Sequence, residues 1–202
     1  MRTNQDSPVN ATAFLLADLS LFPGDFIRLQ QLGDFKAGTI YNDVSKGMVA
    51  IFSSSNVLLS SDQLNRVPGA IDAGIDYNSG TTYFGSLDTN IAEDFAVNDT
   101  SVQIPQGAVY LFIGAADSLY YDNSDPDSDY AVSITRCTCP AGDLDSDCTV
   151  NLSDFGILAS QWLGIPGDIS ADIYPQPGGD GFVDILDLLV LAENWLVPMQ
   201  CE

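Results

Sequence analysis

Two stretches near the C-terminus carry acidic residues at a regular spacing, and each runs into an apolar segment that ends in Trp-Leu. The first stretch fits a loop with side-chain oxygens at positions 1, 3, 5, 9 and 12 and a backbone carbonyl at position 7. Its members, from position 1 to position 12, are Asp143, Asp145, Asp147, Thr149, Asn151 and Asp154. A hard cation such as Ca2+ requires this set of oxygen ligands. We therefore predict that residues 143–154, the first loop, fold around a calcium ion.

The second stretch repeats the pattern with an interruption. Counting back from Asp187 at position 12, positions 1 and 3 fall on Gln176 and Gly178, which offer no carboxylate. The simplest repair takes Asp172 as the first ligand and treats residues 174–178 as an insertion whose backbone carbonyls replace the missing carboxylate. The predicted ligands of this second loop (residues 172–187) are then Asp172, Asp180, the carbonyl of Phe182, Asp184 and Asp187.

The segments after the two loops have helical periodicity. Apolar residues recur at the spacing of one helix face, and they are Phe155, Leu158, Ala159 and Trp162, then Leu188, Leu191, Ala192 and Trp195. Such a stripe is normally buried. We expect two helices that bury these stripes against each other.

This loop-then-helix unit, present twice, resembles a type I dockerin, the calcium-dependent docking module of secreted glycan-degrading assemblies. An EF-hand has Glu at position 12 and a helix before the loop, whereas here position 12 is Asp and residues 140–142 (Pro-Ala-Gly) cannot end a long helix. The resemblance covers residues 142–196 and implies a cohesin-like partner. It places recognition residues at positions 10 and 11, which are Leu152, Ser153, Ile185 and Leu186. Since Ile185 and Leu186 replace small hydroxyl residues common in the family, they indicate either an apolar docking face or a contact with the N-terminal domain.

The charge distribution of the chain excludes one class of function and favours another. The net charge is −22 and no His is present, which excludes nucleic-acid binding as a main role because a phosphate backbone requires Lys and Arg. All six basic residues precede Cys137, so the later carboxylates have no positive side chain to pair with, which favours metal ligation. No apolar run is long enough to insert into a membrane, and residues 1–13 are polar rather than a signal peptide. We expect a mature, soluble chain.

Four cysteines, Cys137, Cys139, Cys148 and Cys201, lie in or beside the C-terminal module and allow three pairings. Cys137-Thr-Cys139 is too short for a zinc knuckle, and no His completes one. We therefore predict disulfides, which a small module with little core needs and which indicate a secreted, extracellular or cell-surface protein. The preferred pairing joins Cys201 to a cysteine near the start of the module, and which of the other three it uses stays open.

Residues 1–136 have the pattern of an antiparallel β-sandwich, jelly-roll-like, ahead of the α-helical module of residues 137–202. Short apolar runs are separated by turn residues, and the predicted strands are 13–16, 25–31, 47–53, 82–84, 95–97, 107–115 and 129–135. Val109, Leu111 and Ile113 alternate with Tyr110, Phe112 and Gly114, so that strand is apolar on both faces. It should lie in the middle of a sheet.

Residues 104–124 and 130–134, with Gly-Met-Val-Ala-Ile-Phe at 47–52, resemble the calcium-dependent bacterial galactose lectins. The resemblance implies a bacterial host and one Ca2+ held by Asp117, Asp122 and Asn123. The spacing from Asp117 to Asp122 is shorter than in the lectins, which favours metal over sugar. Tyr120 and Tyr121 either stack on a sugar ring or pack against the protein.

Catalysis is not expected. A nucleophile triad needs a His or an equivalent base, and none is present. The larger domain has only one Glu, Glu93, and its neighbour Asp94 would point to the opposite face of an extended strand. We expect a non-catalytic secreted protein in which a dockerin-like module mediates calcium-dependent assembly and a lectin-like sandwich binds calcium and a glycan. The alternative is a self-assembling subunit of an extracellular filament or surface layer, in which the module of one copy docks on the sandwich of the next.

Overall fold

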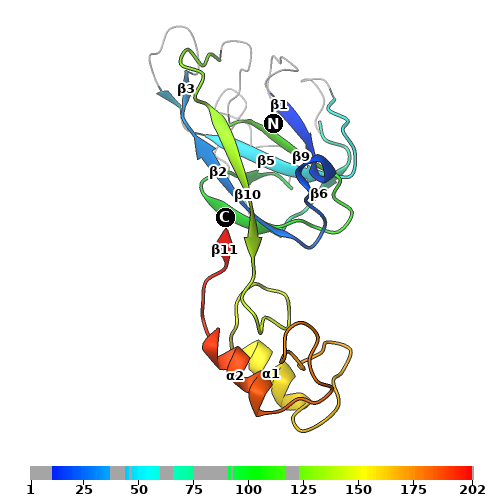
Figure 1. The fold of residues 1–202 in the computed structure, drawn as a ribbon. Coiled ribbons are helices and arrows are strands. Elements are labelled where there is room, and N and C mark those ends of the chain that lie inside the picture. The colour runs from blue at the N-terminus through cyan, green and yellow to red at the C-terminus, as the bar shows by residue number, and fades with distance from the viewer. Residues whose placement is uncertain are drawn as a thin grey trace. The chain divides into compact units, whose positions relative to one another are not determined.

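The computed structural model describes residues 11–36, 44–45, 47–59, 66–74, 91, 93–116 and 123–201. The chain divides into two compact units, Met1–Arg136 and Cys137–Glu202. Apart from one short 3-10 helix, strands make up the regular structure described in the N-terminal unit, and the C-terminal unit contains the two α-helices (Figure 1). The prediction of a mainly β chain with antiparallel sheets is confirmed.

The first sheet of the N-terminal unit is built around two apolar strands that run antiparallel side by side. Its strand order is β1 (Ala11–Leu15), β9 (Tyr110–Ala115), β5 (Met48–Ser53) and β6 (Ala70–Ile71), with β7 (Phe95–Ala96) also paired to β5. All six residues of β5 are buried. Strand β9 pairs with β1 on one side and β5 on the other, so the strand that is apolar on both faces does lie inside a sheet, as predicted.

The second sheet contains β10 (Ala131–Thr138), β2 (Phe26–Leu32) and β8 (Thr100–Gln103), in that order. A short 3-10 helix, η2 (Leu16–Leu19), follows β1, and β3 (Phe35–Lys36) pairs separately with β4 (Val44–Ser45). Residues of both sheets share one hydrophobic core, in which Ile27 and Leu29 of β2 pack with Phe52 of β5 and Leu111 of β9. The predicted strand at 82–84 lies outside the described residues.

The C-terminal unit has two nine-residue helices, α1 (Leu152–Ser160) and α2 (Ile185–Glu193). Its last strand, β11 (Gln200–Cys201), pairs antiparallel with Cys137 and Thr138. The small core of the unit consists of Leu144, Val150, Leu158, Ala171, Val183 and Leu191.

The expectation that both helical stripes are buried is wrong for most of their members. Leu158 and Leu191 are buried, but Phe155 and Trp162 remain 41% and 40% exposed. The reason is that the loops themselves fill the core: Val150 and Val183, at position 8 of each loop, are fully buried. Each helix therefore contributes one fully buried apolar side chain and leaves much of its apolar surface exposed.

Candidate metal centre

The first loop brings three carboxylates together. Asp143, Asp145 and Asp147 each offer one oxygen, and these oxygens lie within 4.8 Å of one another. Oxygens that bind one calcium ion at about 2.3 to 2.6 Å lie at most about 5 Å apart. The donor set therefore fits a calcium ion in both chemistry and spacing.

A network of backbone hydrogen bonds holds these carboxylates in place. The Asp143 carboxylate accepts from the amides of Asp147 and Cys148, both at 3.1 Å, and Asp147 Oδ1 accepts from the Thr149 amide at 2.8 Å. The chain makes these contacts by turning through left-handed conformations at Ser146 and Cys148, whose φ angles are 65° and 66°.

Asp154, at position 12, joins the two ends of the loop. Its Oδ1 accepts from the amides of Leu144 (2.6 Å) and Asp145 (3.2 Å), and its Oδ2 accepts from the Asn151 amide (2.8 Å). The Asn151 side chain in turn accepts from the Ser153 amide, which completes a capping box at the start of α1. Asp154 is fully buried, so its carboxylate organises the loop in addition to any role as a ligand.

The second loop repeats this network and identifies its first residue. Asp172 accepts from the amides of Asp180 (2.9 Å) and Gly181 (2.7 Å), as Asp143 does from Asp147 and Cys148. The Asp187 carboxylate accepts three amides, those of Ile173 (2.6 Å), Tyr174 (2.9 Å) and Asp184 (2.7 Å). Asp172 therefore has the same backbone contacts in the second loop as Asp143 has in the first.

The same comparison shows how the loops differ. The backbone amide of Tyr174 donates to Asp187 as the amide of Asp145 donates to Asp154, so Tyr174 is the residue at position 3 of the second loop. This position therefore has no carboxylate in the second loop. Gly179 packs directly on Asp172, because a Cβ at Gly179 would lie 2.0 Å from the carboxyl group, and its φ is 76°. Among the described residues, three converging carboxylates occur in the first loop but not in the second.

The first loop concentrates negative charge. Loss of hydration on folding, followed by repulsion from Asp154 and Asp147, raises the pKa of Asp143 and of Asp145, although backbone hydrogen bonds oppose the shift. The whole C-terminal unit contains nine Asp, two Glu and no Lys or Arg, a formal charge of −11. A bound cation would relieve this repulsion.

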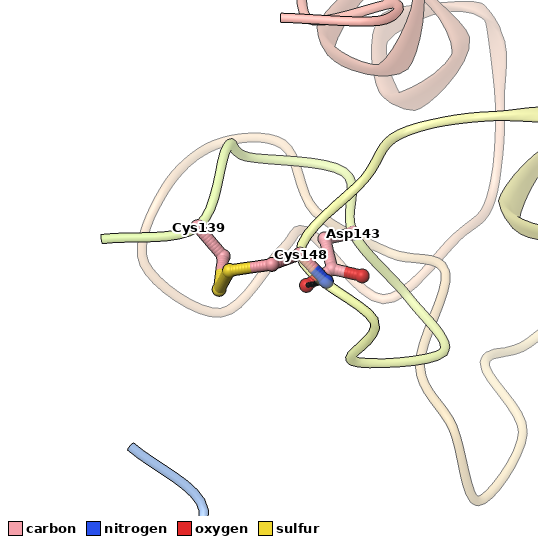
Figure 2. A group of neighbouring side chains, drawn as sticks. All are labelled: Cys139, Asp143 and Cys148. Atoms are coloured by element: carbon pink, nitrogen blue, oxygen red, sulfur yellow. Dashed lines mark hydrogen bonds between the residues drawn. A yellow bond between two sulfur atoms is a disulfide. The ribbon is translucent and has the colours of Figure 1, made fainter. Parts of the chain in front are cut away.

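Two disulfides fix the C-terminal unit, and they are one of the three pairings that the sequence allows. Cys137 is bonded to Cys201, and Cys139 to Cys148. Figure 2 shows the second disulfide beside the Asp143 carboxylate. Because both sulfurs are used in the bond, Cys139 and Cys148 are not metal ligands in this state.

The docking residues expected from the dockerin resemblance lie on the surface at the start of the two helices. Leu152 is 73% exposed, Ile185 is 62% exposed and Leu186 is 39% exposed, and Ser153 is also exposed. In α2 the apolar surface continues to the exposed Leu189. The second helix therefore offers the more apolar of the two faces.

In the N-terminal unit, most of the expected calcium and sugar ligands cannot be placed. Asp117, Asp122, Tyr120 and Tyr121 lie outside the described residues. Asn123 is described, and its buried Oδ1 has no hydrogen-bond partner among the described residues. It lines a cavity of about 420 Å3 whose walls include Phe14, Phe35, Tyr130 and Asp125.

Sequence reasoning missed a third group of carboxylates beside this cavity. Asp125, Asp127 and Asp129 offer oxygens within 4.8 Å of one another. The amides of Asp129 and Tyr130 donate to Asp125 at 3.3 and 3.2 Å, in the same relation as Asp147 and Cys148 to Asp143. The signal was in the sequence, since Asp-Pro-Asp-Ser-Asp has the spacing of Asp-Leu-Asp-Ser-Asp in the first loop. Here the chain continues into β10 instead of a helix, and position 12 is Arg136.

Among the described residues, no helix has both the length and the apolar character needed to cross a membrane. No protein-family model, no curated protein and no solved structure matches the chain.

Proposed function

We propose that this chain is a non-catalytic, secreted calcium-binding protein in which a dockerin-like C-terminal module mediates calcium-dependent protein assembly. The module follows a jelly-roll-like β-sandwich that binds calcium and a glycan. The observation that carries the proposal is the equivalence of the two loops. Asp143 and Asp172 each accept hydrogen bonds from the two amides at positions 5 and 6 of their own loop. Asp154 and Asp187 each accept from the three amides at positions 2, 3 and 9.

Calcium is favoured over other metals by the donor set. The predicted ligands of both loops are oxygens, with no His anywhere in the chain and with both nearby cysteines oxidised. The oxidised cysteines also support secretion, since disulfides persist in oxidising compartments.

Calcium titration of the oxidised protein tests the proposal. Both tryptophans, Trp162 and Trp195, belong to the C-terminal unit, so intrinsic fluorescence reports on that unit alone. We expect calcium to raise its unfolding temperature, with a first loop that binds more tightly than the second, which lacks a position-3 carboxylate. An oxidised protein whose fluorescence-detected unfolding is the same in calcium and in a chelator would contradict the proposal.

The calcium effect should depend on pH. Because the pKa values of Asp143 and Asp145 are raised in the folded state, the folded unit binds these protons more tightly than the unfolded chain. The stability of the calcium-free unit therefore falls as pH rises through the folded-state pKa, and the repulsion that calcium relieves is fully present above it. We expect stabilisation by calcium to be largest at neutral pH and to shrink as pH approaches about 4. Unfolding temperatures measured across this range in calcium and in calcium-depleted buffer provide the check.

Docking is proposed to use the exposed face of α2. Replacing Ile185 and Leu186 together by Ser and Thr should leave calcium binding intact, because their side chains are exposed, and should weaken binding to a cohesin module by at least about tenfold, as expected for two central apolar contacts. The matched control changes Ile169, an exposed apolar residue of the same unit outside the predicted docking positions, to Thr. Surface plasmon resonance on a panel of cohesin modules measures the effect, and equal binding by all variants would remove α2 from the interface.

The second candidate function is a self-assembling structural subunit. It is favoured by the exposed apolar residues of the C-terminal unit, which include Leu163, Ile165 and Leu196, together with the absence of a candidate catalytic pair in the sequence. Electron microscopy of the purified protein with calcium and with a chelator separates the two candidates. Filaments that dissolve in chelator support self-assembly, whereas a monomer that binds to a glycan array supports the binding protein.

A further inference from the structure

The two loops differ at position 6, where the backbone must turn left-handed. The second loop has Gly181 there, with φ of 98°, and the first loop has Cys148, with φ of 66°. The backbone amide of each residue donates a hydrogen bond to Oδ2 of the first aspartate of its loop, at 2.7 Å for Gly181 and 3.1 Å for Cys148. A left-handed conformation is disfavoured for a residue other than glycine. For Cys148 this conformation has a cost that Gly181 does not incur, and a covalent restraint offsets that cost.

That restraint is the bond to Cys139. Cys148 is 2% exposed and its disulfide partner lies nine residues earlier, so the bond closes a ring that contains Asp143, Asp145 and Asp147. In Figure 2 the disulfide leads directly to the backbone nitrogen that faces Asp143. The cross-link thus fixes the residue that holds the first carboxylate of the loop.

The segments that enter the two loops are held by different means. Before the second loop, the Gln161 side chain accepts from the amides of Gly167 (2.6 Å) and Ala171 (3.3 Å) and donates to the Ile169 carbonyl (2.8 Å). The residue equivalent to Gln161 after α2 is Asn194, whose side chain donates to the Val190 carbonyl in its own helix. In the described structure, the segment before the second loop is held by the hydrogen bonds of Gln161. The segment before the first loop is held by the disulfide instead.

We propose that the Cys139–Cys148 disulfide is a functional part of the first calcium loop, so that only the oxidised C-terminal unit binds calcium tightly there. The inference rests on the proposed calcium function and concerns its regulation. Formation of the bond removes two electrons and two protons from the thiols and passes them to a disulfide acceptor through thiol–disulfide exchange. In a reducing compartment Cys148 can relax from its left-handed conformation, and its amide then leaves Asp143. Calcium loading of the first loop, and the assembly that depends on it, would follow oxidation.

The test compares the loops in variants that isolate each one. Calorimetric calcium titrations use an Asp180→Ala background, which reports on the first loop, and an Asp145→Ala background, which reports on the second. In the first background, adding Cys139→Ser and Cys148→Ser should weaken calcium binding at least about tenfold, equivalent to about 1.4 kcal/mol. In the second background the same pair should change affinity less than about twofold, well below that amount.

A further variant, Cys139→Ser with Cys148→Gly, separates the cross-link from the backbone conformation. Glycine accepts the left-handed turn without a disulfide, so this variant should recover only part of the lost affinity. The inference is overturned if the double-serine variant binds calcium at the first loop as tightly as the oxidised parent, or if the glycine variant recovers full affinity. An oxidised parent that binds no calcium at either loop is a different result and rejects the calcium function itself.

Discussion

Replacing both Cys137 and Cys201 by Ser is expected to unfold the C-terminal unit in calcium-free solution. The disulfide joins residues 64 apart in sequence, at the two ends of the unit. Chain-entropy arguments for a closed loop of this length give a stabilisation of roughly 4 kcal/mol. A core as small as the one around Leu158 and Leu191 supplies about 3 to 5 kcal/mol in total. The disulfide therefore contributes about as much as the whole core, and loss of such a bond often abolishes folding of a small secreted domain.

Urea titration followed by tryptophan fluorescence measures this effect, because both tryptophans lie in the C-terminal unit. The matched control is the Cys139→Ser, Cys148→Ser variant, which opens a ring of nine residues and should cost less, roughly 2.5 kcal/mol by the same argument. Calcium should refold part of the Cys137→Ser, Cys201→Ser population, since a ligand that binds only the folded state shifts the equilibrium toward it. An unfolding midpoint equal to that of the parent would show that β11 and the core close the unit without the disulfide.

Spacing in the sequence predicted that Asp143, Asp145 and Asp147 belong to one loop, and their carboxylates do converge there. The sequence also singled out Asp172 as the first residue of the second loop, and its carboxylate accepts the amides of Asp180 and Gly181. Asp125, Asp127 and Asp129 have the same spacing, but they were not predicted as a metal site because a strand, not a helix, follows them. The spacing of these carboxylates was a better guide than the segment that follows them.

Periodicity was less informative about burial and short strands. A helical stripe indicates which residues share a face, but not what covers it, and in the C-terminal unit Val150 and Val183 occupy the space that Phe155 and Trp162 were expected to fill. Strand β8 was missed because Val102 is its only buried side chain among polar neighbours. Strand β11 depends on a partner 64 residues away at Cys137, which no local pattern encodes.

The other large effect is expected at Asp154, where an Ala substitution should destabilise the C-terminal unit even without calcium. The change leaves the amides of Leu144, Asp145 and Asn151 without their acceptor and breaks the capping box of α1. An unsatisfied amide costs about 1 kcal/mol at the lower end of the usual range, which suits the part-buried amides of Asp145 and Asn151, and a lost cap costs about 1 kcal/mol, so the total is on the order of 4 kcal/mol or more.

Asp145→Ala is the matched comparison, because Asp145 is exposed and its carboxylate accepts from the Asp147 amide within its own loop. In calcium-free solution it should change stability by no more than about 0.5 kcal/mol, yet it should abolish most of the stabilisation that calcium gives through the first loop. Asp187→Ala should repeat the Asp154→Ala result, since its carboxylate accepts the equivalent three amides. Equal calcium-free stability for Asp154→Ala and Asp145→Ala, measured by urea unfolding, would mean that position 12 serves the ion alone and that the hydrogen bonds of Asp154 contribute nothing to the fold.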